Sequence, residues 1–202
     1  MTKLLPLFYL PPVSWFAEFL AADYEIVVEK WEHFQKQTYR NRAHIYGANG
    51  KLSLIIPINH NGNRAVQDIK ISDRENWQQQ HWKSIKYAYQ SSPYFEYYED
   101  QLSKIYDFNG DSLFQFNIHA LEVMLKILKS EKSFNFTSEY LKNPEMQDFR
   151  EQFSAKTETE RNFKPYYQVF SDKYGFLADL SVIDVLCNIG PETTTYIQNI
   201  NK

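Results

Sequence analysis

The sequence has a single cysteine and only six glycines, and these two shortages exclude several classes of protein. One cysteine cannot form an internal disulfide or a cysteine-based zinc site. The scattered glycines form neither G-x-G-x-x-G nor a Walker loop, so a dinucleotide-dependent oxidoreductase and a P-loop phosphotransferase both contradict the sequence. Cys187 itself lies in the apolar run VIDVLCN, which is typical of a small buried hydrophobe rather than a nucleophile.

The sequence also lacks an excess of either charge and any long apolar run. The formal net charge is -3 and the pI is near 6.0, so no broad basic surface is available for nucleic acid. Near the N-terminus, Pro11 and Pro12 end the first apolar run, and no later run approaches the roughly 20 apolar residues that span a bilayer. The histidines are dispersed and form no H-E-x-x-H motif. We therefore expect a cytoplasmic protein without a transmembrane segment, a nucleic-acid partner or a metal site.

Aromatic residues are abundant instead, at 17% of the chain. Such a composition favours large rings packed in a core and lining a cleft. A chain of 202 residues is long enough for one domain with a proper core. We predict a single α/β domain over residues 1–202, with a short mixed β-sheet covered by helices and with helical middle and C-terminal segments.

The first third of the chain carries the strand signals. Asn61-Gly62 is the strongest hairpin signal and predicts an antiparallel pair between the strands at its two sides. Residues 31–44 have no regular period and are expected to form a loop. The predicted elements are strands at Leu4–Tyr9, Glu25–Glu29, Leu52–Ile58 and Val66–Ile71, and a helix from Ser14 to Ala22.

The remainder is predicted to be mainly helical. Ser72 and Glu75 form a capping box that predicts a helix to Gln90, and Asp111 is the expected cap of a helix over residues 112–130. Residues 143–164 are polar and charged, which indicates either a lid or a flexible connection. The other predictions are a helix with the stripe Phe95, Tyr98, Leu102 and Ile105, a strand at Tyr166–Phe170, a short helix capped by Ser181, and a final helix over residues 192–200.

Residues 33–42, HFQKQTYRNR, combine cations, amides and aromatic rings that no turn requires for its own stability. Arginine forks suit the oxygens of phosphate or carboxylate, and the rings offer a stacking face to a sugar or base. The alternative is a solvated loop with weak surface ion pairs. The candidate ligand-binding residues of this arm are Gln35, Lys36, Tyr39, Arg40, Asn41 and Arg42.

Two further segments carry candidate site residues. In WQQQHWKSIKYAYQ, His81 beside Trp82 is either a general base or a partly buried histidine, and Tyr94 follows at a helix junction. In DLSVIDVLCN, Asp184 and Asn188 lie four residues apart on an otherwise apolar helix. Asp184 is either a site residue or a helix cap.

Taken together, these segments resemble the WbqC-like protein family. The matching pieces are LPLFYLPPVSWF, HFQKQTYRNR, LSLIIPI with QDIKIS, HWKSIKYAYQSSPYFEYY and FLADLSVIDVLCNIGP, in the order of the family. Members occur in gene clusters for O-antigen and other surface polysaccharides, and one proposed role is the transfer of glycine onto a sugar. The resemblance also implies that the arm from Gln35 to Arg42 lines a ligand cleft.

The resemblance leads to a transferase that modifies a nucleotide-linked or lipid-linked sugar, with an acyl or aminoacyl donor whose identity the sequence does not give. Arg40 and Arg42 bind the anion in this hypothesis, His81 or Asp184 is the general base, and Tyr94 or Trp82 stacks on the sugar. One alternative is a binding module without catalysis, for a nucleotide, a sugar or a partner enzyme. A weaker alternative is an aromatic surface for assembly with other glycan enzymes. No cofactor and no oligomeric state follow from the sequence.

Overall fold

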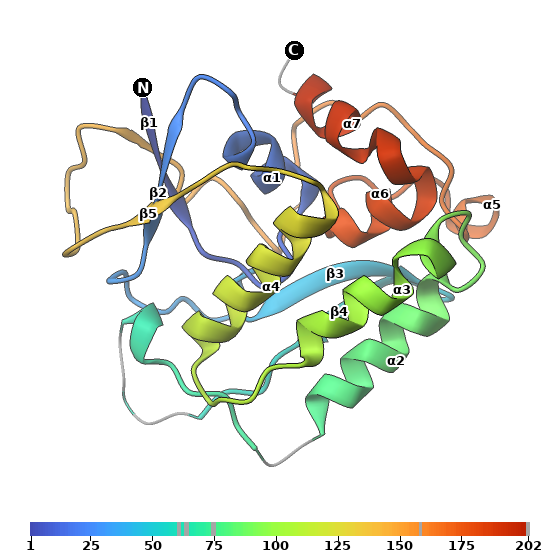
Figure 1. The fold of residues 1–202 in the computed structure, drawn as a ribbon, viewed down its shortest axis with the longest axis horizontal. Coiled ribbons are helices and arrows are strands. Elements are labelled where there is room, and N and C mark those ends of the chain that lie inside the picture. The colour runs from blue at the N-terminus through green and yellow to red at the C-terminus, as the bar shows by residue number, and fades with distance from the viewer. Residues whose placement is uncertain (60–61, 63–64, 74–75, 158, 201–202) are drawn as a thin grey trace.

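A computed structural model describes residues 1–59, 62, 65–73, 76–157 and 159–200 (Figure 1). Within these ranges the chain forms two β-sheets and a set of helices, so the α/β prediction is confirmed. None of the helices in these ranges is both long and apolar enough to cross a membrane.

The first sheet is parallel and lies at the N-terminal side of the molecule (Figure 1). A β-α-β unit forms its centre, because helix α1 (Val13–Phe19) connects β1 (Thr2–Pro6) to β2 (Glu25–Glu29). Two short strands, β5 (Asn135–Phe136) and β6 (Gln147–Asp148), extend it to the order β5-β2-β1-β6. The apolar centre of β1 and β2 is buried, as parallel strands require when both faces are covered. All four carboxyl ends therefore meet at one edge of the sheet.

The second sheet is an antiparallel hairpin of β3 (Arg42–Gly47) and β4 (Gly50–Ile55). Its two-residue turn ends at Gly50, whose φ of 92° lies in the left-handed region that glycine adopts freely. Opposed residues share a face, so Arg42, His44 and Tyr46 lie on the same side as Ile55, Ser53 and Lys51. Ala43, Ile45 and Leu54 are buried on the other side.

The predicted pairing of Leu52–Ile58 with Val66–Ile71 is wrong. Leu52 pairs instead with Ile45, and Val66–Asp68 is a 3-10 helix, η1. A single antiparallel bridge between Ile58 and Ile71 remains from the predicted pair. Pro57 has no N–H for a ladder, and Asn61 lies outside the described residues.

The middle of the chain is helical as predicted. The apolar stripes face the core: Phe95 and Leu102 are buried on α3, and Phe116 and Met124 are buried on α4. Two starting points differ from prediction, because α2 begins at Trp77 rather than near Ser72 and because Ser112, not Asp111, caps α4; Glu75 lies outside the described residues. The elements are α2 (Trp77–Tyr89), α3 (Phe95–Ser103), η2 (Lys104–Tyr106) and α4 (Leu113–Ile127).

The C-terminal part covers α1 and the hairpin with irregular chain and short helices (Figure 1). Residues 143–164 contain β6 and otherwise no helix or strand in their described part, and three of their phenylalanines, Phe149, Phe153 and Phe163, are buried. The predicted strand at Tyr166–Phe170 is absent, because this extended segment bonds through its side chains rather than to a neighbouring strand. The remaining elements are α5 (Ser171–Tyr174), α6 (Val182–Ile189, capped by Ser181 as predicted), η3 (Gly190–Glu192) and α7 (Thr193–Asn199).

Substitution of Ser112 tests the cap of α4. Its hydroxyl accepts a hydrogen bond from the backbone N–H of Gln115, so Ser112→Ala should lower the free energy of unfolding by about 1 kcal/mol. Asp111→Ala is the matched control, since Asp111 is exposed and only forms an ion pair with Lys70. Urea denaturation should show a clearly smaller loss for the control, and the reverse order would assign the cap to Asp111.

Candidate functional site

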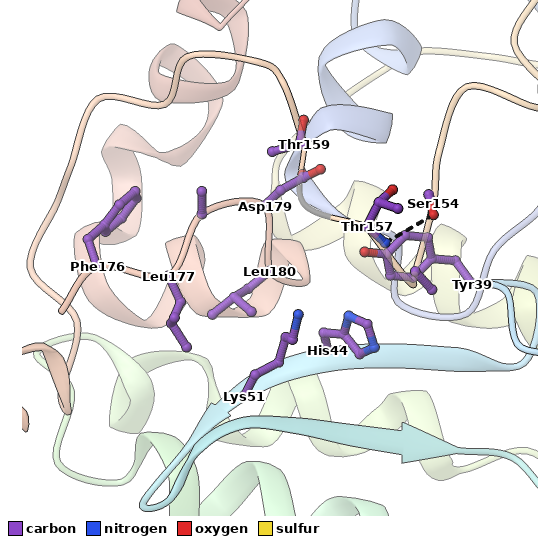
Figure 2. Close-up of a pocket in the computed structure, with 12 residues that line it drawn as sticks. Tyr39, His44, Lys51, Ser154, Thr157, Thr159, Phe176, Leu177, Asp179 and Leu180 are labelled. Atoms are coloured by element: carbon purple, nitrogen blue, oxygen red, sulfur yellow. Dashed lines mark hydrogen bonds between the residues drawn. The ribbon is translucent and has the colours of Figure 1, made fainter. Parts of the chain in front are cut away.

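A cavity of ≈ 190 Å³ lies where the hairpin meets two irregular segments of the C-terminal part (Figure 2). Tyr39, His44 and Lys51 form the hairpin wall, and residues 176–180 form a third wall. The second wall, between them, consists of Ser154, Ala155, Thr157 and Thr159. A neighbouring cavity of ≈ 420 Å³ shares Ser154, Thr157, Thr159 and Asp179, so the two cavities form one groove.

The groove lies beyond the carboxyl ends of the parallel strands. Ser14, at the start of the helix that follows β1, lines it together with the segment that follows β6. The chain leaves β1 toward β2 on one side, whereas β6 joins β1 on the other. Crevices at such switch points are the usual ligand sites of open α/β sheets.

His44 is the most informative side chain of the hairpin wall. It is 5% exposed, faces the cavity and contacts the ring of Tyr39 edge-on at 5.3 Å between centroids (Figure 2). No residue in the described part of the chain forms a hydrogen bond with its imidazole. Burial, Lys51 and Arg42 lower the pKa of His44 to about 4, so the ring is neutral at pH 7. A buried imidazole with free nitrogens at a cavity can donate or accept a proton.

Two cations, Arg42 and Lys51, flank His44 on the same face of the hairpin. Among the described arginines, Arg40, Arg150 and Arg161 each form an ion pair, whereas Arg42 forms none. The buried Nε of Arg42 also has no hydrogen-bond partner. Lys51 likewise forms no ion pair within the described ranges. Among the described residues, no ion pair therefore compensates the positive charge of this hairpin face.

Asp179 provides a carboxylate on the opposite wall. Its two oxygens accept hydrogen bonds from the backbone N–H of Ser14 at 2.8 Å and from the Ser14 hydroxyl at 2.7 Å. Burial raises the pKa of Asp179 in spite of these bonds, and burial together with the Asp179 charge raises the pKa of Tyr39. The φ of Asp179 is 53°. Such strained backbone conformations cluster at the functional sites of proteins.

Only part of the predicted arm reaches this groove. Tyr39 lines the cavity, and Arg42 lies two residues from His44 on the same face of β3. Arg40 instead points inward, is 1% exposed and forms two hydrogen bonds with the carboxylate of Glu32, which occupies its guanidinium. Asn41 donates to the carbonyl of Ile56, Gln35 donates to Glu151, and Lys36 is exposed.

The two predicted catalytic residues belong to separate buried networks. The Nδ1 of His81 lies 2.9 Å from the hydroxyl of Tyr9, and burial lowers its pKa to about 4. Asp184 is fully buried and accepts hydrogen bonds from Tyr89, Tyr166 and Gln168, and burial raises its pKa. Neither residue lines the groove, and the structure does not bring them together.

The remaining predicted residues lie outside the groove as well. Trp82 stacks on Phe95 with 6.2 Å between ring centroids, and Asn188 donates to the carbonyl of Asp184. Tyr94 is 37% exposed and its ring covers Gly190. Their ligand-binding roles stay predictions without support from the cavity.

Three groove residues are not among the predicted site residues: His44, Lys51 and Asp179. The sequence shows His44 only as one of several dispersed histidines and predicts a loop over residues 31–44. The alternation of polar Arg42 and His44 with apolar Ala43 and Ile45 before a turn was the available signal.

Replacement of Arg40 and Arg42 should separate structural from surface roles. Arg40→Met leaves the carboxylate of Glu32 buried and unpaired, so it should lower the free energy of unfolding by about 3–5 kcal/mol. Arg42→Met breaks no ion pair and should cost less than about 1 kcal/mol. Urea denaturation of both variants decides the matter, since equal losses would contradict the assignment of Arg40 to the core.

The lowered pKa of His44 predicts a specific pH dependence of stability. The unfolded chain takes up a proton on this residue near pH 6.5, whereas the folded protein does so near pH 4. Stability from His44 is therefore present above pH 6.5 and is lost toward pH 4, by up to about 1.4 kcal/mol per pH unit. The raised pKa values of Asp179 and Asp184 act in the opposite direction, so the difference between wild type and His44→Gln is the quantity to measure. A difference in unfolding free energy between wild type and His44→Gln that stays constant from pH 6.5 to 4.5 would contradict this prediction.

Comparison with known proteins supports the sequence resemblance. A profile of the WbqC-like protein family matches residues 8–160, which include the hairpin wall and the segment 154–159. Residues 161–202, with Asp179, lie beyond the match. No curated protein and no solved structure shows significant similarity to the chain. Because the match covers most of the sequence, the chain belongs to the WbqC-like protein family.

Proposed function

We propose that this protein is a transferase of O-antigen or other surface-polysaccharide assembly, which moves an acyl or aminoacyl group onto a nucleotide-linked or lipid-linked sugar in the groove. Membership of the WbqC-like family supports the pathway. The observation that carries the proposal is the free, neutral imidazole of His44 at the polar cavity.

His44 is the general base in this proposal. A hydroxyl or amine of the sugar attacks the carbonyl carbon of the activated donor, and His44 accepts the proton that the attacking group loses. The bond from the carbonyl carbon to the donor's leaving group then breaks, and the imidazolium returns the proton to that leaving group. The site thus ends in its initial protonation state.

Tyr39 and Asp179 are the positioning residues of the proposal. Both face the groove near His44, and burial keeps the phenol of Tyr39 protonated at neutral pH, so it can donate a hydrogen bond to a sugar oxygen. The hydrogen bonds of Asp179 to Ser14 keep the carboxylate at the mouth shared by both cavities. A sugar that carries several hydroxyls fits such a lining better than an apolar ligand does.

The test is a product assay with matched histidine variants. The protein is incubated with a panel of nucleotide-linked sugars and activated acyl and aminoacyl donors, and mass spectrometry detects sugars that have gained the acyl mass. His44→Gln should lower the rate by about 10²–10⁴-fold, the usual contribution of a general base. His33→Gln replaces an exposed histidine outside the groove and should leave the rate unchanged.

Thermal shift with each sugar distinguishes transfer from binding alone. A sugar at 100 times its dissociation constant should add about 2.7 kcal/mol to the free energy of unfolding, which is enough to detect. A shift without any product would favour the binding module without catalysis. Product formation that is equal in wild type and His44→Gln would remove His44 from the mechanism.

A further inference from the structure

The charge of the hairpin face differs from the charge of the core. The buried cations are matched by carboxylates: Lys3 by Glu18, Arg150 by Asp148 and Glu29, and Arg40 by Glu32. Arg42 and Lys51 have no such partner in the described part of the chain. Because an uncompensated charge beside a partly desolvated cavity raises the electrostatic free energy, an anion that binds there would lower it.

The geometry of the hairpin determines the size of that anion. His44 is opposite Ser53 in the ladder, so Lys51 is its diagonal neighbour at about 7–8 Å, and Arg42 lies two residues away on the same strand. The long side chains of Arg42 and Lys51 therefore extend on either side of the shorter imidazole. Arg42 is opposite Ile55, four residues from Lys51 along β4, so an anion with two linked charged groups reaches both cations better than a single small ion does.

We propose that a diphosphate binds across Arg42 and Lys51, over the imidazole of His44, as the anionic part of the sugar substrate. This inference rests on the proposed function for the identity of the rest of the substrate. The guanidinium of Arg42, whose Nε is buried without a partner, gains phosphate oxygens as acceptors. The ammonium of Lys51 lies at the cavity and contacts the second phosphoryl group as a point charge (Figure 2).

A bound diphosphate would also raise the low pKa of His44 and so make this residue a stronger base. The charges of Arg42 and Lys51 both contribute to the low pKa of His44. An anion over the ring counters these charges and favours its protonated form. Substrate binding thus makes His44 a stronger base when the sugar is in place.

The direct test is isothermal titration calorimetry with inorganic pyrophosphate, at several salt concentrations. Lys51→Met and Arg42→Met should each raise the dissociation constant at least tenfold and should reduce its salt dependence. Lys83→Met is the matched control, because it removes an exposed positive charge on α2 rather than on the hairpin. The control should change the dissociation constant less than twofold. Pyrophosphate that does not bind, or that binds equally to Lys51→Met and Lys83→Met, would overturn the inference.

Further ligands define the source of the diphosphate. Uridine diphosphate represents a nucleotide-linked sugar, and geranyl diphosphate represents a lipid-linked one. Tighter binding of either than of pyrophosphate, with the same dependence on Arg42 and Lys51, supports the inference and names the carrier. Acetate or glycine that binds as tightly as pyrophosphate would overturn it in favour of a carboxylate.

The outcomes of this test and of the transfer assay are independent. Pyrophosphate binding that depends on Arg42 and Lys51, with no transfer product, would support the diphosphate site and contradict the transferase. Transfer that proceeds equally in Lys51→Met and wild type, and equally with sugars that lack a diphosphate, would contradict the diphosphate site and leave the transferase in place.

Discussion

The buried carboxylate of Asp184 holds the two main walls of the groove together. Tyr89 donates a hydrogen bond to it from α2 and accepts one from the backbone N–H of Tyr46 in β3. On the other side, Gln168 donates to the same carboxylate and bonds to both the N–H and the carbonyl of Leu177, a residue of the third wall. A carboxylate with three donors can remain buried, whereas the loss of one donor leaves an expensive charge. The relative position of hairpin and wall thus depends on one side chain that touches no ligand.

Charge is distributed differently at the edge of the parallel sheet and at the hairpin face. At the carboxyl edge of the parallel sheet, Glu29 is buried and accepts hydrogen bonds from Trp31, Thr137 and Arg150. These groups satisfy one another and leave little for a ligand to gain. The hairpin face has the opposite character, since Arg42 and Lys51 act on a neutral His44 and form no ion pair with an acid in the described part of the chain. An anionic ligand would therefore gain more at the hairpin face than at the sheet edge, where the charged groups already pair with one another.

Local patterns in the sequence were sufficient where an element is stabilised by its own neighbours. The stripe of α4 and the cap of α6 by Ser181 could be predicted because period and cap chemistry are local. The hairpin was misplaced because Asn61-Gly62 is a stronger turn signal than Ala48-Asn49.

The site was predictable only in part for a similar reason. Arginines in HFQKQTYRNR suggest anion chemistry as a hypothesis, but the sequence cannot show which of them folds inward. Glu32 is eight residues before Arg40, and their pairing depends on the chain path between them. The donors of Asp184 come from two other parts of the chain, so its buried role was equally invisible.

The two walls of the groove differ in stiffness, and this difference has a functional meaning. The hairpin wall is fixed by a continuous ladder from Arg42 to Ile55, so the positions of its charges are set by backbone hydrogen bonds. The third wall is irregular and is held by side chains, through Gln168 at Leu177 and through Ser14 at Asp179. An irregular wall can change its shape at low cost, while a ladder cannot. In the proposed function, the rigid wall would hold the charged and reacting part of the substrate, and the irregular wall would hold the part that differs between sugars.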